Sequence, residues 1–554
     1  MLHLRQATAA MALMAAMGAA VPFATPAAAD PIRTIELVTR PQAAQPAEFQ
    51  FVQLIAQEWR KLGLDVDVNV MPWEQMIQAI WFSRDEWDTT AWQMVGRPER
   101  SDPDEIVFNL FHSSTAEQGF NFIGYNNPDY DALVEAQRIE LDPDARREIV
   151  RKAQTLLAED QPNMMLAHPQ STYAFNTSVW DPATVVDQSG IGIRNTWSYI
   201  QMAPAGDASD IILNSSDNVT AMNPLYISGG TDSWITELVW DRLMRIGPDG
   251  LPQPWAATGY EWIDDTTITV TLRDDMMWHD GTPVTPEDVV FSFEAAGSGE
   301  APMYEPFVTA IEDITIDGME LTFNLTQPSA AFLTATLSKI NIIPKHVWEP
   351  VIEEQQTLET NAESFQEDAP IGSGPYKFGS WTLNEEVVLE ANADHWAAPK
   401  ADRWILRIVP NVEAALGMMR SGEINFLSDF PGDPSVLVTL AEEDDTIEVV
   451  STVDIGFRYV AFNNRRPPFD DPAFRRALSS SVDRRLIVGA AFRGFAVPSN
   501  SVVSPALGFW HNEETTGAME TSIDAAQTML EAAGYRLIDG QLHYPEGVSE
   551  TLGE

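Results

Sequence analysis

Helix-type and strand-type hydrophobic patterns alternate along the whole chain, and this mixture restricts the fold more than any other feature. Apolar residues recur at helical spacing in 50–63, whereas 64–70 and 266–272 alternate apolar and polar residues as half-buried strands do. The sequence contains no short-period repeat. A chain of 554 residues is also too long for one hydrophobic core. We therefore predict two or three lobes of α/β or α+β type.

Capping signals place several further elements. Aspartate followed by proline marks helix starts at 142–143 and 471–472, because the aspartate caps the helix and the proline occupies its first turn. Thr285 and Asp288 form the pattern of a capping box. The other predicted elements are a strand at 210–214, a hairpin over 309–326 and a helix over about 522–533.

The chain is strongly acidic and contains no cysteine. Lys and Arg number 33 against 82 Asp and Glu, which gives a formal net charge of −49. Such a surface repels nucleic-acid phosphates and anionic lipid headgroups, and it suits solubility in a salty exterior. The absence of cysteine excludes disulfides, thiolate metal sites and cysteine nucleophiles.

The first 29 residues have the pattern of a secretory signal peptide. Arg5 is the only charge, an apolar run follows from Ala7 to Val21, and Ala27-Ala28-Ala29 offers a cleavage site before Asp30. The run is shorter than the roughly 20 apolar residues that span a bilayer. We predict an exported protein that begins at Asp30, and an uncleaved anchor is the alternative.

Four segments carry a resemblance to a known family. They are VQLIAQEWRKLGL at 52–64, RDEWDTTAWQMVGRPERSDPDEIVFNLF at 84–111, VTLRDDMMWHDGTPVTPEDVVFSF at 270–293 and IGSGPYKFGSW at 371–381. Each resembles a segment of the periplasmic oligopeptide-binding proteins, the family 5 solute receptors of ABC importers. The resemblance implies an α/β, two-lobed fold of the periplasmic-binding-protein type (type II, cluster C) with an extra small domain.

The order of these segments differs from that of the family. The first two resemble the family's C-terminal third, yet here they come first. In family order the chain would start near Asp210, and the small, polar segment 203–209 would join the former C-terminus to the former N-terminus. We therefore predict a circular permutant, whose ends at Asp30 and Glu554 lie close together on one lobe. The alternative is a chimera of unrelated fragments, whose lobes would not complete each other's sheets.

The resemblance implies a division of the chain into lobes that recruit distant segments. The expected parts are a signal peptide at 1–29, a C-terminal-type lobe at 30–175, a hinge-bearing lobe made of 176–240 and 368–458, a small extra domain at 241–367, and the remainder of the C-terminal-type lobe at 459–554.

The resemblance also implies which residues would hold a ligand between the lobes. In peptide-binding relatives a tryptophan and a nearby aspartate of the C-terminal lobe matter most, and the aspartate pairs with the ligand's α-amino group. Trp73 matches the tryptophan and Asp88 matches a structural aspartate, but Arg97 stands where the amine anchor is expected. The family also has an acidic residue near its first loop, and Ser228 stands at the comparable position here.

Arg97 changes the expected chemistry of the ligand. Removing one partner of a buried ion pair costs about 3–5 kcal/mol, whereas a micromolar ligand binds with only about −8 kcal/mol in total. An inward-facing Arg97 therefore favours a carboxylate, a phosphate or a neutral ligand, because a guanidinium forks onto acidic groups. The alternative is that Arg97 pairs with Asp102 or Asp104 at the surface.

Six further residues are candidate ligand contacts. They are Trp92 and Met94 on the same lobe as Trp73, Tyr226 in the family's first cleft-facing loop, and Phe457, Arg458 and Tyr459 on a strand that bridges the lobes in relatives. Arg458 would meet an anionic group in the cleft or form an internal salt bridge. Methionine and aromatic residues at this spacing more often belong to a hydrophobic core.

The sequence predicts binding and no catalysis. It contains no G-x-S-x-G, HExxH or Walker A pattern, and Pro375 removes an N–H that a phosphate would need from the glycine-containing run at 372–376. We expect no cofactor and no metal site. A secreted hydrolase on the same scaffold is one alternative, and a chaperone-like or sensory receptor is another.

The predicted function is that of a periplasmic substrate-binding component of an ABC importer, which captures a peptide-like solute and delivers it to a membrane permease. The alternative solutes are an oligosaccharide, an opine or a metal chelate. The expected partners are the ligand and the permease and ATPase complex of the inner membrane, with no nucleic acid, and the protein is expected to be a monomer.

Overall fold

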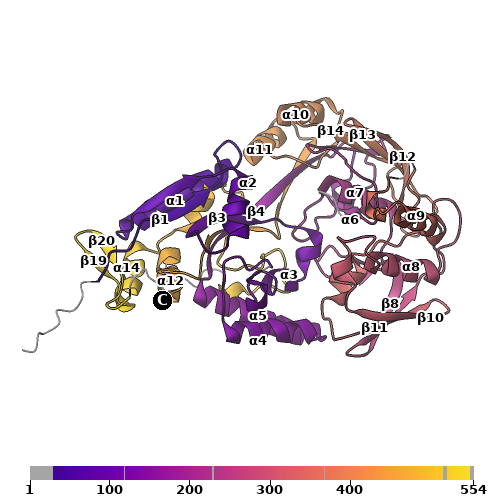
Figure 1. Cartoon of the computed structure of the whole chain (residues 1–554). Coiled ribbons are helices and arrows are strands. Elements are labelled where there is room, and N and C mark those ends of the chain that lie inside the picture. Colours follow the sequence, from indigo (N-terminus) through magenta and orange to yellow (C-terminus); the bar gives the residue numbers. More distant parts are fainter. Residues whose placement is uncertain (1–28, 118, 227–229, 367–368, 516–520, 549–554) are drawn as a thin grey trace, which may run out of the picture.

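The computed structural model describes residues 29–117, 119–226, 230–366, 369–515 and 521–548 (Figure 1). The predicted signal segment therefore lies outside the described residues up to position 28. Helices and strands are mixed throughout the described ranges, which confirms the predicted α/β class. Within these ranges no helix combines the length and the apolar character needed to cross a lipid bilayer.

A 12-stranded sheet is the largest sheet among the described residues. Ten of its strands follow in the order β12 (Tyr376–Thr382), β13 (Glu386–Ala391), β14 (Arg403–Ile408), β5 (Asp210–Ser215), β15 (Phe426–Leu427), β4 (Asn163–Asn176), β17 (Phe457–Phe462), β3 (Thr89–Met94), β1 (Ile35–Thr39) and β2 (Val66–Val70). The other two, β16 (Ile447–Val453) and β18 (Ala496–Pro498), also pair with β4. Some neighbours in this sheet, such as β3 and β17, come from distant parts of the chain.

Strands from both ends of the chain build the half of this sheet that runs from β4 to β2. Strand β1 pairs parallel with β2 and β3, and β17 pairs antiparallel with β3 on one side and β4 on the other. Helices α1 (Pro46–Lys61), α12 (Pro472–Ser480), α13 (Arg484–Ala491) and α14 (Ile523–Ala532) contribute to its core. Ile35, Trp59, Phe462 and Phe474 are completely buried in that core. The sheets of a chimera would not complete one another in this way.

The two ends of the described chain meet at the edge of this half. Pro31 lies opposite His543 in an antiparallel bridge, next to the hairpin of β19 (Arg536–Ile538) and β20 (Gln541–His543). The Tyr544 N–H donates to the Asp30 carbonyl at 2.9 Å, and the Ile32 N–H donates to the Leu542 carbonyl at 2.9 Å. The prediction that the ends lie together is confirmed as far as Asp30 and Tyr544, and Glu554 lies outside the described residues.

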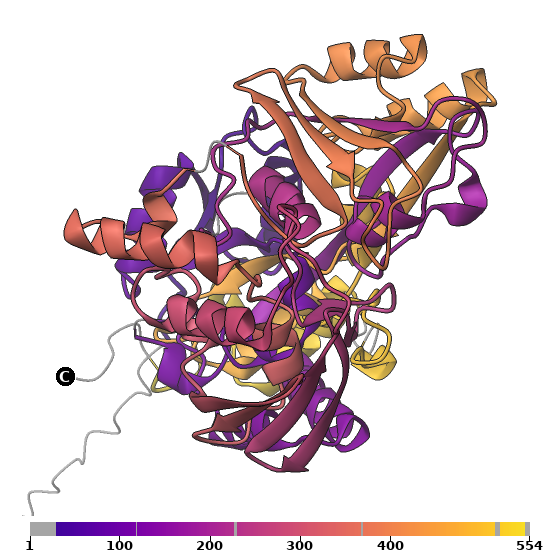
Figure 2. The same ribbon diagram turned by 90° about the vertical axis from the view of Figure 1, so that its right-hand side faces the viewer.

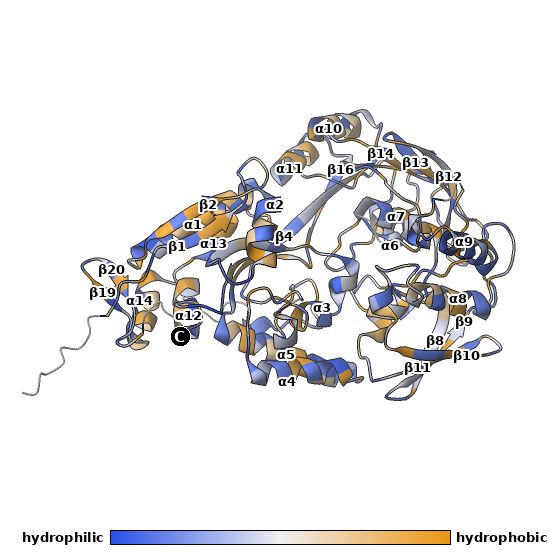
Figure 3. Ribbon diagram, viewed as in Figure 1, coloured by the Kyte–Doolittle hydropathy of each residue, from blue (hydrophilic) through white to orange (hydrophobic). Residues whose placement is uncertain are grey.

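A second core lies below the same half of the sheet, toward the middle of Figure 1. Its helices include α2 (Trp73–Met76), α3 (Asp104–Val107), α4 (Pro128–Ile139) and α5 (Pro143–Asp160). Trp87, Phe111 and Tyr130 are buried there. Polar and apolar residues alternate along α4 and α5, so that each helix shows both colours in Figure 3.

The other half of the sheet is built by residues between 163 and 453. Strand β5 lies parallel to β14 and β15, and β12, β13 and β14 form an antiparallel series. The helices of this part are α6 (Thr196–Gln201), α7 (Gly230–Val239), α10 (Val412–Ser421) and α11 (Pro434–Glu443). The predicted linker 203–209 forms no helix and no extended strand and connects α6 to β5.

A separate four-stranded sheet stands beside this half, at the opposite end from β12–β14 (Figure 2). Its antiparallel order is β10 (Ile311–Asp317), β11 (Glu320–Leu325), β9 (Thr267–Leu272) and β8 (Ala257–Asp264), and α8 (Pro286–Gly297) and α9 (Lys345–Thr357) accompany it. The predicted hairpin is the β10–β11 pair. The predicted capping box is confirmed, because Thr285 and Asp288 bond each other's backbone N–H groups at the start of α8.

Candidate binding site

Two chain crossings join the halves of the large sheet. Strand β4 pairs with β17 and β18 up to Pro169 and with β16 from Gln170 onward. The chain returns through Asp454–Gly456, which connects β16 to β17. The Asp454 N–H donates to the Pro169 carbonyl at 2.8 Å, so the two crossings lie side by side. Two adjacent connections of this kind form a hinge about which two lobes can rotate.

Glycines allow a third segment to pack against the hinge. A Cβ atom on Gly456 would lie 2.3 Å from the Met94 carbonyl oxygen and 2.6 Å from the Gly96 nitrogen. A Cβ atom on Gly96 would lie 1.7 Å from Asp454 Oδ1. The end of β3 therefore rests directly on the Asp454–Gly456 crossing. This contact directs the segment after β3, residues 96–98, toward the opposite lobe.

A cavity of about 160 Å³ opens beside the hinge, and we call it the hinge cavity. Segment 96–98 lines it from one lobe, and residues of β4, of 188–195 and of α7 line it from the other side. Its charged and aromatic lining residues include Arg97, Arg194, Trp234, Glu237, Lys339 and Asp454. The cavity is thus bounded by both lobes and by the hinge itself.

Arg97 is exposed at the mouth of the hinge cavity. Among the described residues its guanidinium has no hydrogen-bond or ion-pair partner. Asp102 is instead bound by Arg146, with an N–O distance of 2.6 Å, and Asp104 is bound by Arg138 at 3.3 Å. The alternative in which Arg97 pairs with one of these aspartates is therefore not realised.

Arg194 presents a second guanidinium from the opposite wall. It lies 4.1 Å from the ring centroid of Trp234 and 5.9 Å from that of Tyr173, and its Nη1 donates to the Ser428 carbonyl at 3.1 Å. Stacking on an indole holds a guanidinium in one plane and leaves its edge available for an acceptor. Arg194 follows Gly190 and Gly192, whose φ angles of 74° and 88° require glycine.

The two carboxylates of the hinge cavity already have partners. Asp454 accepts from the Gly456 N–H at 2.6 Å and from the Ser171 hydroxyl at 3.4 Å, and burial raises the pKa of its carboxyl. Glu237 lies 3.7 Å from Arg242 and accepts from the Thr196 hydroxyl at 3.4 Å. Both carboxylates are therefore oriented by neighbouring groups of the protein.

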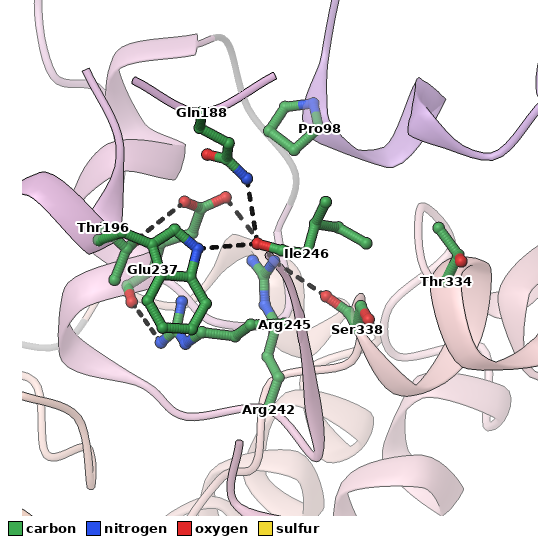
Figure 4. Close-up of a pocket in the computed structure, with 10 residues that line it drawn as sticks. Pro98, Gln188, Thr196, Glu237, Arg242, Arg245, Ile246, Thr334 and Ser338 are labelled. Carbon is green, nitrogen blue, oxygen red and sulfur yellow. Dashed lines mark hydrogen bonds and ion pairs between the residues drawn. The ribbon is translucent and has the colours of Figure 1, made fainter. Parts of the chain in front are cut away.

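A smaller cavity of about 30 Å³ shares Pro98, Gln188 and Glu237 with the hinge cavity (Figure 4). Arg242 and Arg245 extend along its wall, and Gln188 Nε2 donates to the Ile246 carbonyl at 3.0 Å. Burial lowers the pKa of Arg245 to about 10, so this guanidinium stays cationic at neutral pH. The polar region beside the hinge therefore continues between the lobes. In the part of the chain that the structure describes, no group of three His, Asp or Glu side chains is placed to hold a metal ion.

Trp73, Trp92 and Met94 lie on the lobe of β3 and are not among the residues that line the hinge cavity. Trp73 is 41% exposed, and its ring lies 5.1 Å from that of the buried Trp92 and 5.4 Å from the Arg40 guanidinium. Met94 is half-buried at the end of β3. Tyr226 is 37% exposed before α7, and Ser228 lies outside the described residues. Their role as ligand contacts stays a prediction.

Of the three predicted residues of β17, two are buried in the core and one is half-buried. Phe457 and Tyr459 are buried in the same hydrophobic cluster, with ring centroids 5.4 Å apart. Arg458 is half-buried, and burial lowers its pKa although Asp454 acts in the opposite direction. Asp88, predicted to be structural, pairs with Arg33 and accepts from the Glu36 N–H at 3.0 Å.

Of the residues predicted from the sequence as ligand contacts, Arg97 is the one that lines the hinge cavity among the described residues. Arg194, Trp234, Lys339 and Asp454 were not among the candidate residues, because no motif joins them. One signal was available in the sequence, since Gly190 and Gly192 stand just before an arginine and indicate a tightly packed backbone.

Two lobes on a shared sheet, joined by paired crossings beside a polar cavity, define the class of two-lobed binding proteins. The chain belongs to the bacterial extracellular solute-binding proteins of family 5, whose family model matches residues 252–552. The family expected from the sequence is therefore confirmed.

Characterised relatives share about a quarter of their aligned residues with this chain. The glutathione-binding protein GsiB of Salmonella typhi is 26% identical over 363 residues, covering 64% of this chain and 65% of the relative. The oligopeptide-binding protein AppA of Bacillus subtilis is 25% identical over 339 residues, covering 60% of each chain. The chain thus spans about 60–65% of the length of these relatives. The solved structure of the same AppA with a nonapeptide aligns with a TM-score of 0.45 and 22% identity, covering 60% of this chain and 66% of that one.

Proposed function

We propose that this chain is the substrate-binding component of an ABC importer and captures a peptide-like solute in the periplasm. Its membership of family 5 supports a solute-binding role. Two relatives are named as glutathione-binding and oligopeptide-binding proteins. These names favour a peptide-like solute over a sugar, an opine or a metal chelate. The secretory pattern of residues 1–29 fits export.

The observation that carries this proposal is the hinge cavity, which both lobes line. Rotation about Pro169–Gln170 and Asp454–Gly456 would separate Arg97 from Arg194 and Trp234 and admit a ligand. A ligand shifts such an equilibrium only by binding the closed form more tightly than the open form. The closed form would then dock on a membrane permease and release the solute there. This proposal assigns no catalytic step to the chain.

Existing contacts would help to hold the closed form. The Ala330 N–H donates to the Arg138 carbonyl at 2.8 Å, and Arg146 Nη1 lies 3.4 Å from the Ala330 carbonyl oxygen. Arg138 and Arg146 belong to the lobe of Arg97, whereas Ala330 follows the four-stranded sheet. A receptor that must load and unload requires that such contacts leave the open form accessible.

Native mass spectrometry of the protein isolated from its own periplasm tests this proposal. We expect a bound species with the mass of a small peptide or a related solute. A pool of di- to pentapeptides should then raise the unfolding temperature of the ligand-free protein, because a ligand at a hundredfold excess over its Kd stabilises by about 2.7 kcal/mol.

A cavity-filling variant provides the matched control. Ser233 lines the hinge cavity, so Ser233→Trp should abolish the ligand-induced shift. Thr528→Trp adds an indole on the exposed face of α14 and should retain the shift. If the isolated protein carries no small molecule and neither peptides nor sugars change its unfolding temperature, the proposal is wrong.

A further inference from the structure

The region beside the hinge concentrates positive charge in a strongly acidic protein. The hinge cavity and the smaller cavity next to it are lined by five cationic side chains, Arg97, Arg194, Arg242, Arg245 and Lys339, against the two carboxylates Glu237 and Asp454. The whole chain has a formal charge of −49 and only 33 Lys and Arg. Arg242 is paired with Glu237 at 3.7 Å and Arg245 with the buried Asp241 at 3.9 Å, so the local excess of positive charge rests on Arg97, Arg194 and Lys339 against Asp454.

The two guanidiniums of the hinge cavity come from opposite lobes. Arg97 follows β3, and Arg194 lies between β4 and α6. Arg97 has no side-chain partner among the described residues, and Arg194 gives one bond to a backbone carbonyl while it stacks on Trp234. Both therefore keep N–H donors for a ligand. Glu237 pairs with Arg242 at 3.7 Å, and Asp454 accepts from the Gly456 N–H at 2.6 Å, and neither carboxylate lies within ion-pair distance of Arg97 or Arg194.

We propose that the hinge cavity receives a carboxylate of the ligand, which Arg97 and Arg194 clamp from the two lobes. Resting on the proposed function, this inference defines the substrate class as solutes with a free carboxylate. A carboxylate between two guanidiniums accepts several charge-assisted hydrogen bonds, which are stronger than neutral ones. The first turn of α7 supports the site, because Gly230 and Ser233 line the cavity and a helix N-terminus favours negative charge.

This arrangement couples the charge of the ligand to closure of the lobes. In an open form only one guanidinium can reach the carboxylate, whereas the closed form offers both. The second interaction therefore exists only after closure, and this is the differential affinity that a hinge equilibrium requires. A ligand without the carboxylate would leave the Arg97 and Arg194 guanidiniums lining one cavity without a counter-charge from the ligand, and their like charges would then oppose closure.

Paired peptide probes test the inference. One probe is a pool of tripeptides with free C-terminal carboxylates, and the second is the same pool with C-terminal amides. Digalacturonate serves as a third probe, a carboxylate that is not a peptide. Native mass spectrometry selects the members that bind, and titration calorimetry gives their Kd. We expect the carboxylate forms to bind about ten- to a hundredfold more tightly than their amides, as a hydrogen bond to a charged group predicts.

Charge-neutral variants assign the effect to the two arginines. Arg97→Gln should lower the affinity for the carboxylate probe about ten- to a hundredfold and leave the affinity for the amide almost unchanged. The exposed Arg97 has no partner to lose, so this variant should fold normally. Arg194→Gln should act in the same direction. Arg485→Gln removes an equal charge from the exposed surface of α13 and should bind as the wild type does.

Each outcome separates the inference from the function on which it rests. Amides that bind as tightly as carboxylates, or an Arg97→Gln variant with unchanged affinity, would overturn the carboxylate clamp and leave solute binding intact. Binding of digalacturonate in preference to the peptides would support the clamp and move the substrate class from peptides to sugar acids. Binding of none of the three probes to a ligand-free protein would overturn the clamp and count against the proposed function as well.

Discussion

The ion pair between Asp102 and Arg146 shows how one residue supports the lobe that carries Arg97. Arg146 donates to both carboxylate oxygens of Asp102, at 2.8 and 2.6 Å, and the two side chains are only 3–4% exposed. Arg146 also donates to the Gln137 side chain and reaches Ala330 of the opposite lobe. The pair thus anchors the base of the segment that projects toward the hinge cavity.

Removal of Asp102 should destabilise the protein strongly. Asp102→Ala leaves a buried guanidinium without its counter-charge, and we expect a loss of about 3–5 kcal/mol in the free energy of unfolding. The control is Asp144→Ala, because Asp144 is 77% exposed in its pair with Arg147 and such pairs contribute no more than about 1 kcal/mol. Urea denaturation of both variants measures the difference. Equal midpoints for the two would show that the buried pair has no special weight.

At the scale of elements, the contact between the end of β3 and the Asp454–Gly456 crossing determines where the hinge cavity forms. We expect Gly456→Ala to cost about 1–3 kcal/mol, because the added methyl group meets backbone atoms at 2.3 and 2.6 Å that cannot move aside cheaply. The same variant should weaken ligand binding, since it pushes the Arg97 segment away from the opposite wall.

Gly417→Ala provides the control for this variant. Gly417 lies within α10, where an added methyl group meets nothing within 4 Å, and alanine should stabilise the helix by up to about 1 kcal/mol. Denaturation midpoints and Kd values for the carboxylate tripeptides compare the two substitutions. A neutral effect of Gly456→Ala on both quantities would mean that the hinge does not depend on this close approach.

At the scale of the whole molecule, the hydrogen bonds between residues 30–32 and 542–544 support the proposal of a circular permutation. Residues near both termini share one core, and the family model matches the later part of the chain, 252–552. The linker 203–209 has the small, polar composition of a former junction. The proposed division into lobes at 30–175 with 459–554, at 176–240 with 368–458, and at 241–367 rests on the same arrangement.

A chain rearranged to the family order should fold. The variant begins at Asp207, continues to Glu554, joins directly to Asp30 and ends at Gly206. The new connection from Tyr544 through Glu554 to Asp30 forms a short loop. Closing it costs little, since each doubling of loop length adds only about 0.6 kcal/mol. We expect unchanged circular dichroism, a similar unfolding midpoint and the same ligand affinity. A second variant with new ends between Gln170 and Ser171 interrupts β4 and should fail to fold, and failure of the first variant alone would contradict the proposal.

Local elements followed from the sequence because their causes lie within a few residues. Asp142 and Thr285 cap their helices through N–H groups three residues away, and in β2 Val66 is buried whereas the next residue, Asp67, is exposed. The burial of the candidate site residues, by contrast, could not be predicted from a local pattern. Phe457 and Tyr459 point into the core because β17 is a central strand with both faces covered, and an alternating pattern cannot tell which face borders a cleft.

The sequence by itself determined the mixed α/β class, the family and the helix caps at Asp142, Thr285 and Asp471, since each depends on composition, motif or short-range hydrogen bonds. Only the tertiary structure decided which charges meet at the hinge. Arg97, Arg194 and Asp454 stand about a hundred or more residues apart, and they line one cavity because β4 and the Asp454–Gly456 crossing pass side by side. Such proximity arises from the pairing of distant strands, which no local pattern records.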